Sequence, residues 1–317
     1  MQKTRNRASI VFQWEPAAKA PHASRREPGA SSSVTEARNL PLWLSRVDAD
    51  AALLQPERLR ARMDALDELD ALLSDSPETR VDSLFARAMA LRKKLEAANG
   101  AVYAAIRAEV RGGRGAEWLR KWMALCGDAG APRPGLGYDH LDELIAGILG
   151  LKEPNSEAVL APEMVFYQPT PARHILEMIR LSGLGENDVL IDLGSGLGHV
   201  PMLASILTEA RAIGIEIDPV LVRCARECAA GLGLMRVSFI EQDALAADLS
   251  TGTVFHLYTP FTGGILRAVL DRLRSEGERR VIRVCTLGPC SEIVAAESWL
   301  RAMTAVDTKR IACFRSG

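Results

Sequence analysis

The stretch VLIDLGSGLGHVPML, residues 189–203, decides the fold of this 317-residue chain. It begins as a short apolar run interrupted by one aspartate, passes through three closely spaced glycines and continues as an apolar helical pattern. Glycine accepts positive φ angles and lets two stretches of backbone approach closely, which a sharp turn requires. The stretch therefore predicts a buried strand, a tight turn and a helix, the opening unit of an α/β domain.

Strand and helix patterns alternate downstream of this unit. Short apolar runs that predict strands lie at residues 189–193, 212–217, 237–240, 254–258 and 280–286. Between the first of these strands, residues 200–209 and 219–232 carry the apolar spacing of helices. Such alternation is typical of a mostly parallel sheet with helices on both of its faces.

The spacing of the glycines discriminates between two kinds of nucleotide site. A dinucleotide-binding turn has the pattern GxGxxG, in which the third glycine permits close packing of the helix. In this chain the glycines are Gly194, Gly196 and Gly198, and His199 stands where the third dinucleotide glycine would be. This mismatch argues against a nicotinamide dinucleotide.

An acidic residue at the end of the first strand makes the pattern more specific. DLGSGLG, residues 192–198, resembles the first motif of the class I S-adenosylmethionine-dependent methyltransferases. The resemblance implies that S-adenosylmethionine is the cofactor and that Asp192 suits the cationic amino-acid half of that molecule. The turn residues that would lie against the cofactor are Gly194, Ser195, Gly196 and Gly198.

Two more acidic residues lie at the positions along the chain where the same family has its other cofactor contacts. Glu216 ends the second predicted strand, where the family holds ribose hydroxyls, and Asp243 follows the third strand, where the family holds the adenine amine. The backbone of Ala244 is implied as a second adenine contact. Helix capping alone would explain Asp218 but not the whole set.

The stretch FYQPTPARHILEMI, residues 166–179, adds an element before the first strand. Thr170 as N-cap and Pro171 at the first helical position would leave backbone donors at a helix start, which suits a carboxylate. The stretch resembles the segment with which many amino-group methyltransferases hold the methionine carboxylate, and this implies that Tyr167, Gln168 and Thr170 line the same site. An ordinary capped helix is the alternative interpretation.

The segment YTPF, residues 258–261, follows the fourth predicted strand. It resembles the polar-Pro-Pro-aromatic motif of enzymes that methylate amines. The resemblance implies that Tyr258 aligns the nucleophile and contacts the cofactor, and that Phe261 forms an aromatic wall. The motif favours nitrogen as the acceptor, but Tyr258 and Thr259 depart from the family pattern, so oxygen stays open.

Other candidates for chemistry lie outside these motifs. GYDHLDEL, residues 137–144, supplies Tyr138 and His140 as candidate residues of a substrate lid. The candidate general bases toward a hydroxyl acceptor are His140, His174, His199 and His256. A single histidine is more often structural. No pair of carboxylates follows the fourth strand in a metal-binding pattern, and the six cysteines form no CxxC pair, so we expect no metal site.

Composition and charge are those of a globular protein in water. Hydrophobic residues make up 48% of the chain, and 39 basic residues against 40 acidic ones give a net charge of -1. The net charge is therefore too small to attract nucleic acid or an anionic membrane by long-range electrostatics. No apolar run is long enough for a membrane span, and the N-terminus lacks the apolar core of a secretory signal, so we expect a cytoplasmic protein.

Three parts follow one another along the chain. Residues 1–38 hold seven basic residues against three acidic ones and predict a disordered basic tail, with an organellar address as the alternative. Residues 39–135 predict a helical module that serves as a lid or a docking unit, and the apolar stripe of its longest helix is expected to be packed core. Residues 136–317 are the expected methyltransferase domain.

The resemblance covers residues 160–317 and implies a Rossmann-like, seven-stranded, mostly parallel sheet whose last strand, residues 311–314, runs in reverse. The core of this sheet also resembles that of the non-SET histone lysine methyltransferases. We expect in-line transfer of a methyl group to a nucleophile of a small-molecule metabolite. A protein substrate of the lysine type is the alternative, and a scaffold that binds S-adenosylmethionine without catalysis is the third hypothesis.

Overall fold

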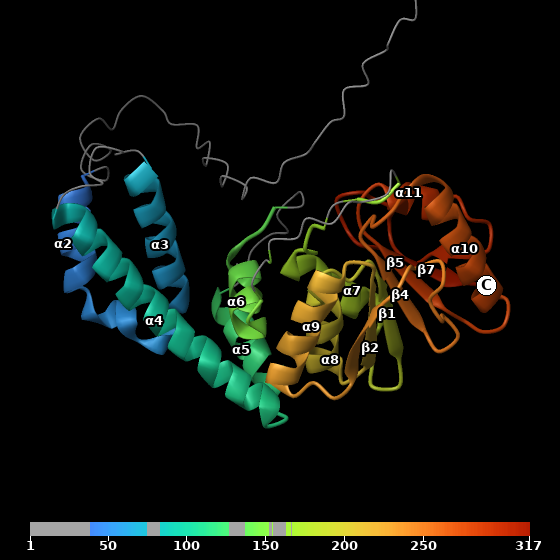
Figure 1. The fold of residues 1–317 in the computed structure, drawn as a ribbon, viewed down its shortest axis with the longest axis horizontal. Coiled ribbons are helices and arrows are strands. Elements are labelled where there is room, and N and C mark those ends of the chain that lie inside the picture. Colours follow the sequence, from blue (N-terminus) through green and yellow to red (C-terminus); the bar gives the residue numbers. More distant parts are fainter. Residues whose placement is uncertain (1–38, 75–82, 127–136, 152–153, 155–162, 166) are drawn as a thin grey trace, which may run out of the picture.

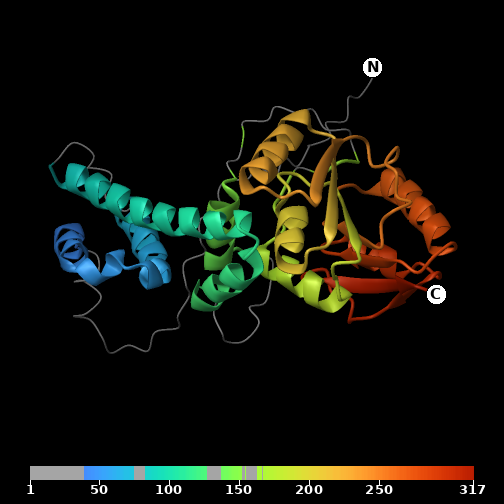
Figure 2. The ribbon, with the colours of Figure 1, turned by 90° about the horizontal axis from the view of Figure 1, so that it is seen from below.

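The structure is a computed structural model, and it describes residues 39–317 except 75–82, 127–136, 152–153, 155–162 and 166. The predicted basic tail therefore lies outside the described residues. A helical part, blue to green, projects from an α/β part, yellow to red (Figures 1 and 2). Within the described ranges, no helix combines the length and the apolar character that crossing a membrane requires.

The α/β part is built on one sheet of seven strands in the order β3-β2-β1-β4-β5-β7-β6. The first five strands in that order pair in parallel, and β7 pairs antiparallel with both of its neighbours. The Rossmann-like sheet with a reversed last strand is thus confirmed. The strands are β1 Val189–Leu193, β2 Arg211–Glu216, β3 Val237–Glu241, β4 Val254–Leu257, β5 Arg283–Thr286, β6 Leu300–Ala302 and β7 Ala312–Ser316.

The burial of each strand follows from its place in the sheet. All five residues of β1 are buried, as expected for a central strand that is covered on both faces. β3 lies at an edge, and Phe239 is the only buried residue of its five. The opposite edge strand, β6, is three residues long and two of them are exposed. No apolar run marks β6, which is why the sequence patterns did not predict it.

Helices cover both faces of the sheet (Figure 1). One face packs against α7, α8 and α9, and the other packs against α10 and α11. Because the carboxyl ends of the parallel strands share one edge, the loops after β1, β2, β4 and β5 meet there. The helices are α7 Ala172–Ser182, α8 His199–Thr208, α9 Pro219–Leu232, α10 Gly263–Gly277 and α11 Cys290–Ala295.

The helical part has two hydrophobic cores. Ala88, Leu91 and Leu95 of α4 pack with α2 and α3, whereas Val102 and Ile106 of the same helix belong to the core that continues into the sheet. The expectation that the apolar stripe of this helix is packed core is therefore confirmed. The elements are α2 Leu40–Ala49, η1 Ala51–Leu54, η2 Pro56–Arg58, α3 Leu59–Ser74, α4 Ser83–Arg111, α5 Gly115–Cys126 and α6 His140–Leu149.

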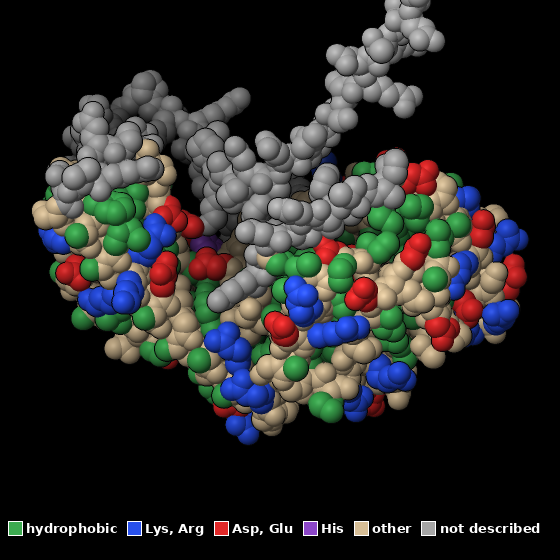
Figure 3. All heavy atoms as spheres, in the orientation of Figure 1, with side chains coloured by type: hydrophobic (Ala, Val, Ile, Leu, Met, Phe, Trp, Pro, Cys, Tyr) green, Lys and Arg blue, Asp and Glu red, His purple; other side chains and the backbone are tan. Residues whose placement is uncertain are grey.

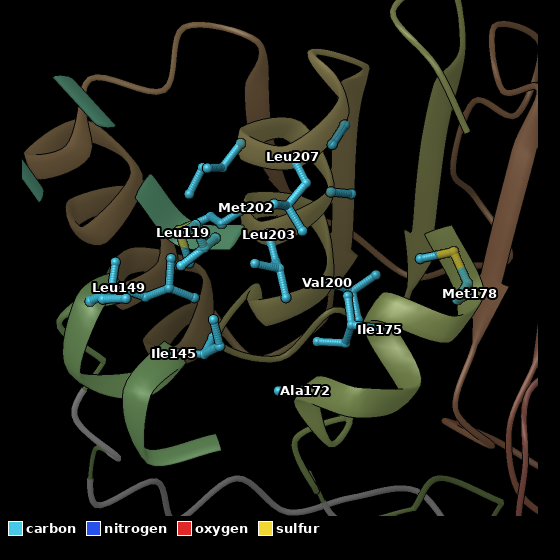
Figure 4. Packing of buried hydrophobic residues seen from close by; sticks show 14 of the residues in the cluster. Leu119, Ile145, Leu149, Ala172, Ile175, Met178, Val200, Met202, Leu203 and Leu207 are labelled. Atoms are coloured by element: carbon cyan, nitrogen blue, oxygen red, sulfur yellow. The ribbon is translucent and has the colours of Figure 1, made fainter. Parts of the chain in front are cut away.

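Two helices of the helical part pack directly onto the α/β part (Figure 4). Leu119 of α5 and Ile145 and Leu149 of α6 lie in one cluster with Met202 and Leu203 of α8. This hydrophobic core joins α5, on one side of the predicted boundary at residue 135, to α8 on the other.

Arginines of the helical part also contact the ends of helices beside the sheet. The guanidinium of Arg120 donates to the carbonyl of Leu207 in α8 (2.8 Å), and that of Arg111 donates to the carbonyl of Gly231 in α9 (3.1 Å). The C-terminal end of a helix has unpaired carbonyls and a partial negative charge, so a cation is favourable there. These contacts orient the helical part relative to the sheet.

Candidate cofactor and active site

The turn after β1 has a backbone that glycine adopts readily. Gly194, Gly196 and Gly198 have φ angles of 81°, 51° and 82°. The amides of Gly194 and Ser195 both donate to the carbonyl of Ile215, at 2.8 and 3.0 Å, so the turn is anchored on β2. Gly198 is the N-cap of α8, and the first amides of that helix have no partner within the helix.

Each of these glycines also lies directly against a side chain from another segment. The side chains that leave no room for a Cβ are Pro260 against Gly194 (2.3 Å from an ideal Cβ), Tyr167 against Gly196 (1.9 Å) and Phe239 against Gly198 (2.3 Å). The turn therefore gathers three segments around one stretch of backbone: the segment before α7, the loop after β4 and strand β3.

Glu216, at the end of β2, contacts the same turn through its carboxylate. Its Oε2 accepts a hydrogen bond from the amide of Gly196 (2.8 Å), and its Oε1 accepts from the amides of Ile217 and Asp218 (2.8 and 3.0 Å). Desolvation raises the pKa of Glu216, although the three amide donors oppose the rise. A carboxylate has about four acceptor positions, so Glu216 can also accept from a hydroxyl group of a ligand.

Asp192 and His256 form a buried pair at the sheet. They are register neighbours on β1 and β4, and Oδ1 of Asp192 lies 2.7 Å from Nδ1 of His256. Asp192 is 3% exposed and His256 is 1% exposed. Because a buried carboxylate needs a donor, the imidazole is the group that makes burial of Asp192 tolerable.

Helix α7 begins one residue later than the sequence predicts. Pro171 is the N-cap and supplies no side-chain cap, and the amide of Ala172 donates instead to the carboxylate of Asp142 in α6 (2.7 Å). Thr170, expected as the N-cap, is buried, and Gln168 is exposed. An amide expected to be free for a cofactor carboxylate is thus bound by a carboxylate of the chain itself.

Tyr167 reaches the glycine turn from the same segment. Its hydroxyl lies 3.1 Å from Nδ1 of His199, the first residue of α8. Desolvation lowers the pKa of His199 to about 4, so the imidazole is neutral at pH 7. With its ring against Gly196, Tyr167 places an aromatic side chain beside the turn.

The loop after β4 packs onto the other side of the turn. Thr259 has a positive φ of 42°, and its Oγ1 donates to the carbonyl of Leu287 (2.9 Å). The hydroxyl of Tyr258 is buried and has no hydrogen-bond partner within the part of the chain that the structure describes. Burial raises the pKa of Tyr258 to about 12, so this group is a neutral phenol at pH 7.

Phe261 lies apart from Tyr258. Its ring is 5% exposed and belongs to the cluster on the α10 face, whereas Tyr258 packs against the cluster on the opposite face. The backbone of Phe261 forms an antiparallel bridge with Met164. The structure therefore places the Phe261 ring in the core and does not bring the two aromatic side chains together.

The two lid candidates, Tyr138 just before α6 and His140 at its first position, have different surroundings. Nε2 of His140 lies 2.9 Å from Oδ1 of Asp64 in α3, at the junction between α6 and the outer helices, which are α2, α3 and the first half of α4. The hydroxyl of Tyr138 donates to the carbonyl of Pro169, next to Thr170 (2.7 Å). Tyr138 thus contacts the segment before α7, and His140 contacts the helical part.

The candidates for the adenine end follow β3. Oδ1 of Asp243 accepts from the amide of Leu245 (2.9 Å), which forms a local turn. The carbonyl of Ala244 accepts from the guanidinium of Arg272 in α10 (2.9 Å). Both residues are half-buried. They lie after β3, in the loop where the resemblance expects the adenine.

Unpaired polar atoms at this edge fit a polar cofactor. The hydroxyls of Ser195 and Tyr258 and Nε2 of His256 are buried and lack a partner among the residues described. Such atoms are costly unless they are paired, and a bound polar ligand can pair them. In the described ranges, no group of three or more His, Cys, Asp or Glu side chains is arranged to hold a metal ion.

Some residues shape the site in ways that the sequence did not indicate. His256, one of the candidate general bases, pairs with Asp192; Asp142 contacts the start of α7; and Gly214 leaves room for the ring of Phe239, which would lie 2.5 Å from a Cβ at that position. A signal existed for His256, because it is the one polar residue in the predicted strand VFHLY, and polar side chains inside buried strands have partners. Contacts between distant segments, such as that of Asp142, leave no such signal.

The family of the α/β part follows from comparison with known proteins. Residues 184–308 match a family described as a methyltransferase domain. Together with the sheet order and the glycine turn, this match assigns the α/β part to the class I S-adenosylmethionine-dependent methyltransferases. S-adenosylmethionine is the cofactor of this class, as the sequence motifs imply.

Several known proteins are similar to part of the chain. The ribosomal protein L11 methyltransferase of Deinococcus radiodurans is 31% identical over 139 residues, which are 43% of this chain and 47% of that protein. A protein-lysine N-methyltransferase of Saccharolobus islandicus is 25% identical over 137 residues, which are 43% of this chain and 78% of that protein. The chain thus spans about half the length of the first of these relatives.

A solved structure is similar as well. The RNA methyltransferase from Salinibacter ruber in complex with S-adenosyl-L-homocysteine is 31% identical, with 47% of this chain and 92% of that chain covered and a TM-score of 0.39.

We expect Gly196→Ala to weaken S-adenosylmethionine binding about tenfold and to lower the free energy of unfolding by about 1–2 kcal/mol. The added methyl group would strain a residue with φ of 51° and displace the ring of Tyr167. Isothermal titration calorimetry and urea denaturation measure the two effects. Gly185→Ala is the control, because nothing lies within 4 Å of a Cβ there. Equal affinity of Gly196→Ala and the wild type would contradict a close contact between this turn and the cofactor.

Proposed function

We propose that this protein transfers a methyl group from S-adenosylmethionine to an amine nitrogen of a small-molecule metabolite. The observation that carries the proposal is the unpaired, buried hydroxyl of Tyr258 directly after β4, in the loop whose Pro260 packs against Gly194 of the glycine turn. S-adenosylmethionine supplies a methyl group activated by a sulfonium sulfur. Asp192, Glu216 and the glycine turn would hold this cofactor, and Tyr258 would orient the acceptor.

The state of the side chains at this edge favours an amine over a hydroxyl acceptor. A neutral phenol can accept a hydrogen bond from an N–H group and leave the lone pair of the nitrogen free to react. A hydroxyl acceptor needs a general base, but the imidazole of His199, with its pKa lowered to about 4, is a weak one. A neutral amine, formed when the ammonium loses its proton to water, attacks the methyl carbon through its lone pair without a base at the transition state, whereas a hydroxyl must be deprotonated as it attacks.

Contacts of α6 support a small substrate. Tyr138 and Asp142 of this region hydrogen-bond to the backbone at Pro169 and Ala172. The helical part therefore packs against the segment before α7, which would line the cofactor site. Acidic and basic side chains are interspersed on the visible face of the described residues (Figure 3). Together with the net charge of -1, this offers no strong attraction for an anionic macromolecule.

A protein side-chain amine is the second candidate acceptor. The relatives favour it, because one is named a ribosomal protein L11 methyltransferase and another a protein-lysine N-methyltransferase. A lysine side chain offers the same nucleophile as a small amine. The two candidates differ in whether the helical part covers the substrate or docks the protein that carries it.

Transfer of a labelled methyl group decides between these candidates. The full chain is incubated with S-adenosylmethionine labelled in the methyl group and with a cell lysate separated into small-molecule, protein and nucleic-acid fractions. Label in the small-molecule fraction supports the proposal and gives the mass of the product. Label in the protein fraction supports the second candidate, and label in nucleic acid overturns both.

We expect Tyr258→Phe to lower kcat about 30-fold, since loss of one orienting hydrogen bond costs about 2 kcal/mol in the transition state. The ring stays in place, so the Kd of S-adenosylmethionine should change less than about threefold. Tyr103→Phe is the matched control, because the Tyr103 hydroxyl is likewise buried without a hydrogen-bond partner in the described part but lies on α4. An unchanged kcat for Tyr258→Phe would remove this residue from the mechanism.

A further inference from the structure

The segment before α7 is held at two backbone positions by the start of α6. The hydroxyl of Tyr138 donates to the carbonyl of Pro169 (2.7 Å), and Oδ1 of Asp142 accepts from the amide of Ala172 (2.7 Å). These positions lie on either side of Thr170, one of the residues implied in cofactor binding. The segment therefore has a fixed path over three residues, although its own side chains do not cap α7.

The contact of Asp142 is part of a built arrangement. Oδ2 of Asp142 accepts from the amide of Asp139 (2.8 Å), while Oδ1 of Asp139 accepts from the amide of Leu141 (2.9 Å), so the two residues form a capping box at the start of α6. The carboxylate of Asp142 thus caps two helices at once. A negative charge is favourable at a helix start, and here one charge serves α6 and α7.

The same segment forms one wall of the cofactor site. Tyr167 lies two residues before Pro169, and its ring packs against Gly196 in the turn after β1. A shift of the backbone at residues 169–172 would carry Thr170 and Tyr167 with it. The position of this wall therefore depends on groups that belong to α6 and not to the matched methyltransferase domain, residues 184–308.

We propose that Tyr138 and Asp142 are positioning residues that set the affinity for S-adenosylmethionine by holding the backbone of residues 169–172. This proposal rests on the cofactor site described above and not on the identity of the acceptor. Neither side chain acts on the reacting atoms; each acts through the peptide group that it binds.

Desolvation gives the charge of Asp142 a distinctive pH dependence. It raises the pKa of Asp142 to about 6. The charged groups that face it are Asp139 on the same helical turn, which raises the pKa, and Arg173 on α7, which lowers it. Because the pKa is raised in the folded protein, protonation of Asp142 favours folding as the pH falls from 7 to 5. Cofactor affinity should fall over the same range, so the two properties respond in opposite directions.

The test measures the Kd of S-adenosylmethionine by calorimetry on the full chain. We expect Tyr138→Phe to raise the Kd about fivefold and Asp142→Ala to raise it about tenfold at pH 7. Asp139→Ala is the matched control, because it removes the other half of the capping box and leaves the contact with Ala172. It should lower the thermal stability but change the Kd less than about twofold.

The pH profile separates positioning from a loss of stability. Asp142→Asn keeps an oxygen that can accept from Ala172 and has no charge at any pH, so it should bind about threefold more weakly than the wild type at pH 7 and equally at pH 5. A constant ratio of the two Kd values between pH 5 and 7 would overturn the proposal. Tighter binding by Asp142→Ala would overturn it too, since the carboxylate would then compete with the cofactor.

The assignment of the cofactor and the proposal about Asp142 fail in different ways. If the wild type does not bind S-adenosylmethionine, the cofactor site itself is misassigned. If the wild type binds it and Tyr138→Phe, Asp142→Ala and Asp142→Asn all bind it with the Kd of the wild type, only the role of Tyr138 and Asp142 is wrong.

Discussion

Asp192→Asn is expected to weaken S-adenosylmethionine binding about 100-fold, because a buried hydrogen bond to a charged partner contributes about 1.5–3 kcal/mol. The resemblance assigns this carboxylate to the cationic half of the cofactor, and the structure shows it 3% exposed beside His256. Asparagine has the same shape, so no cavity forms and the sheet should stay folded. Calorimetry gives the affinity, and circular dichroism gives the melting temperature.

Asp188→Asn is the matched control for this prediction. Asp188 precedes the opposite end of the same strand, where its carboxylate accepts from Thr253 Oγ1 (2.7 Å) and pairs with Arg283. Removing that charge should lower stability by about 1–3 kcal/mol and leave the affinity for the cofactor unchanged. If Asp192→Asn binds S-adenosylmethionine as tightly as Asp188→Asn does, the cofactor does not use the carboxylate of Asp192.

Arg62→Met is expected to lower the free energy of unfolding of the outer helices by about 4 kcal/mol. Arg62 is fully buried, and its Nη1 donates to the carbonyls of Leu53 (2.8 Å) and Gln55 (2.5 Å) while its Nε donates to Oδ1 of Asn99 (2.7 Å). Methionine fills much of the same volume but leaves three acceptors without donors. Urea denaturation followed by circular dichroism at 222 nm measures the loss.

The control for this change is Arg58→Met, one helical turn earlier on the chain and exposed to solvent. It should change the free energy of unfolding by less than about 0.5 kcal/mol. A loss below about 1 kcal/mol for Arg62→Met would mean that water satisfies the three acceptors and that the guanidinium is dispensable. Such a small loss would also show that the stability of the outer helices does not depend on the hydrogen bonds of Arg62.

Local patterns predicted most of the α/β part. The sequence marks β1 at the residues that the structure shows, and it marks β2, β3 and β4 to within one residue at either end. These strands are buried and bounded by turn residues, so each carries its own signal. β6 carries none, because a short exposed edge strand forms through pairing with β7 and not through its own side chains.

The candidate site was predictable where it depends on one local motif. The positive φ angles of Gly194, Gly196 and Gly198 follow from residue type and spacing. The burial of Phe261 and the late start of α7 do not, because each depends on a segment far away in the sequence. Asp142 of α6 caps α7 in place of Thr170, which was expected to do so. This exchange of capping residues can be seen only when the relative positions of α6 and α7 are known.

Helix α4 runs without a break through both hydrophobic cores, which makes its middle mechanically important. Leu95 is anchored in the outer core and Val102 in the core shared with the sheet, and Gly100 lies between them with nothing within 4 Å of its missing Cβ. Glycine resists bending of a helix less than other residues because it has low helix propensity and no side chain to brace it. A torque applied to the outer helices would therefore concentrate bending of the helix near Gly100, between the two hydrophobic cores.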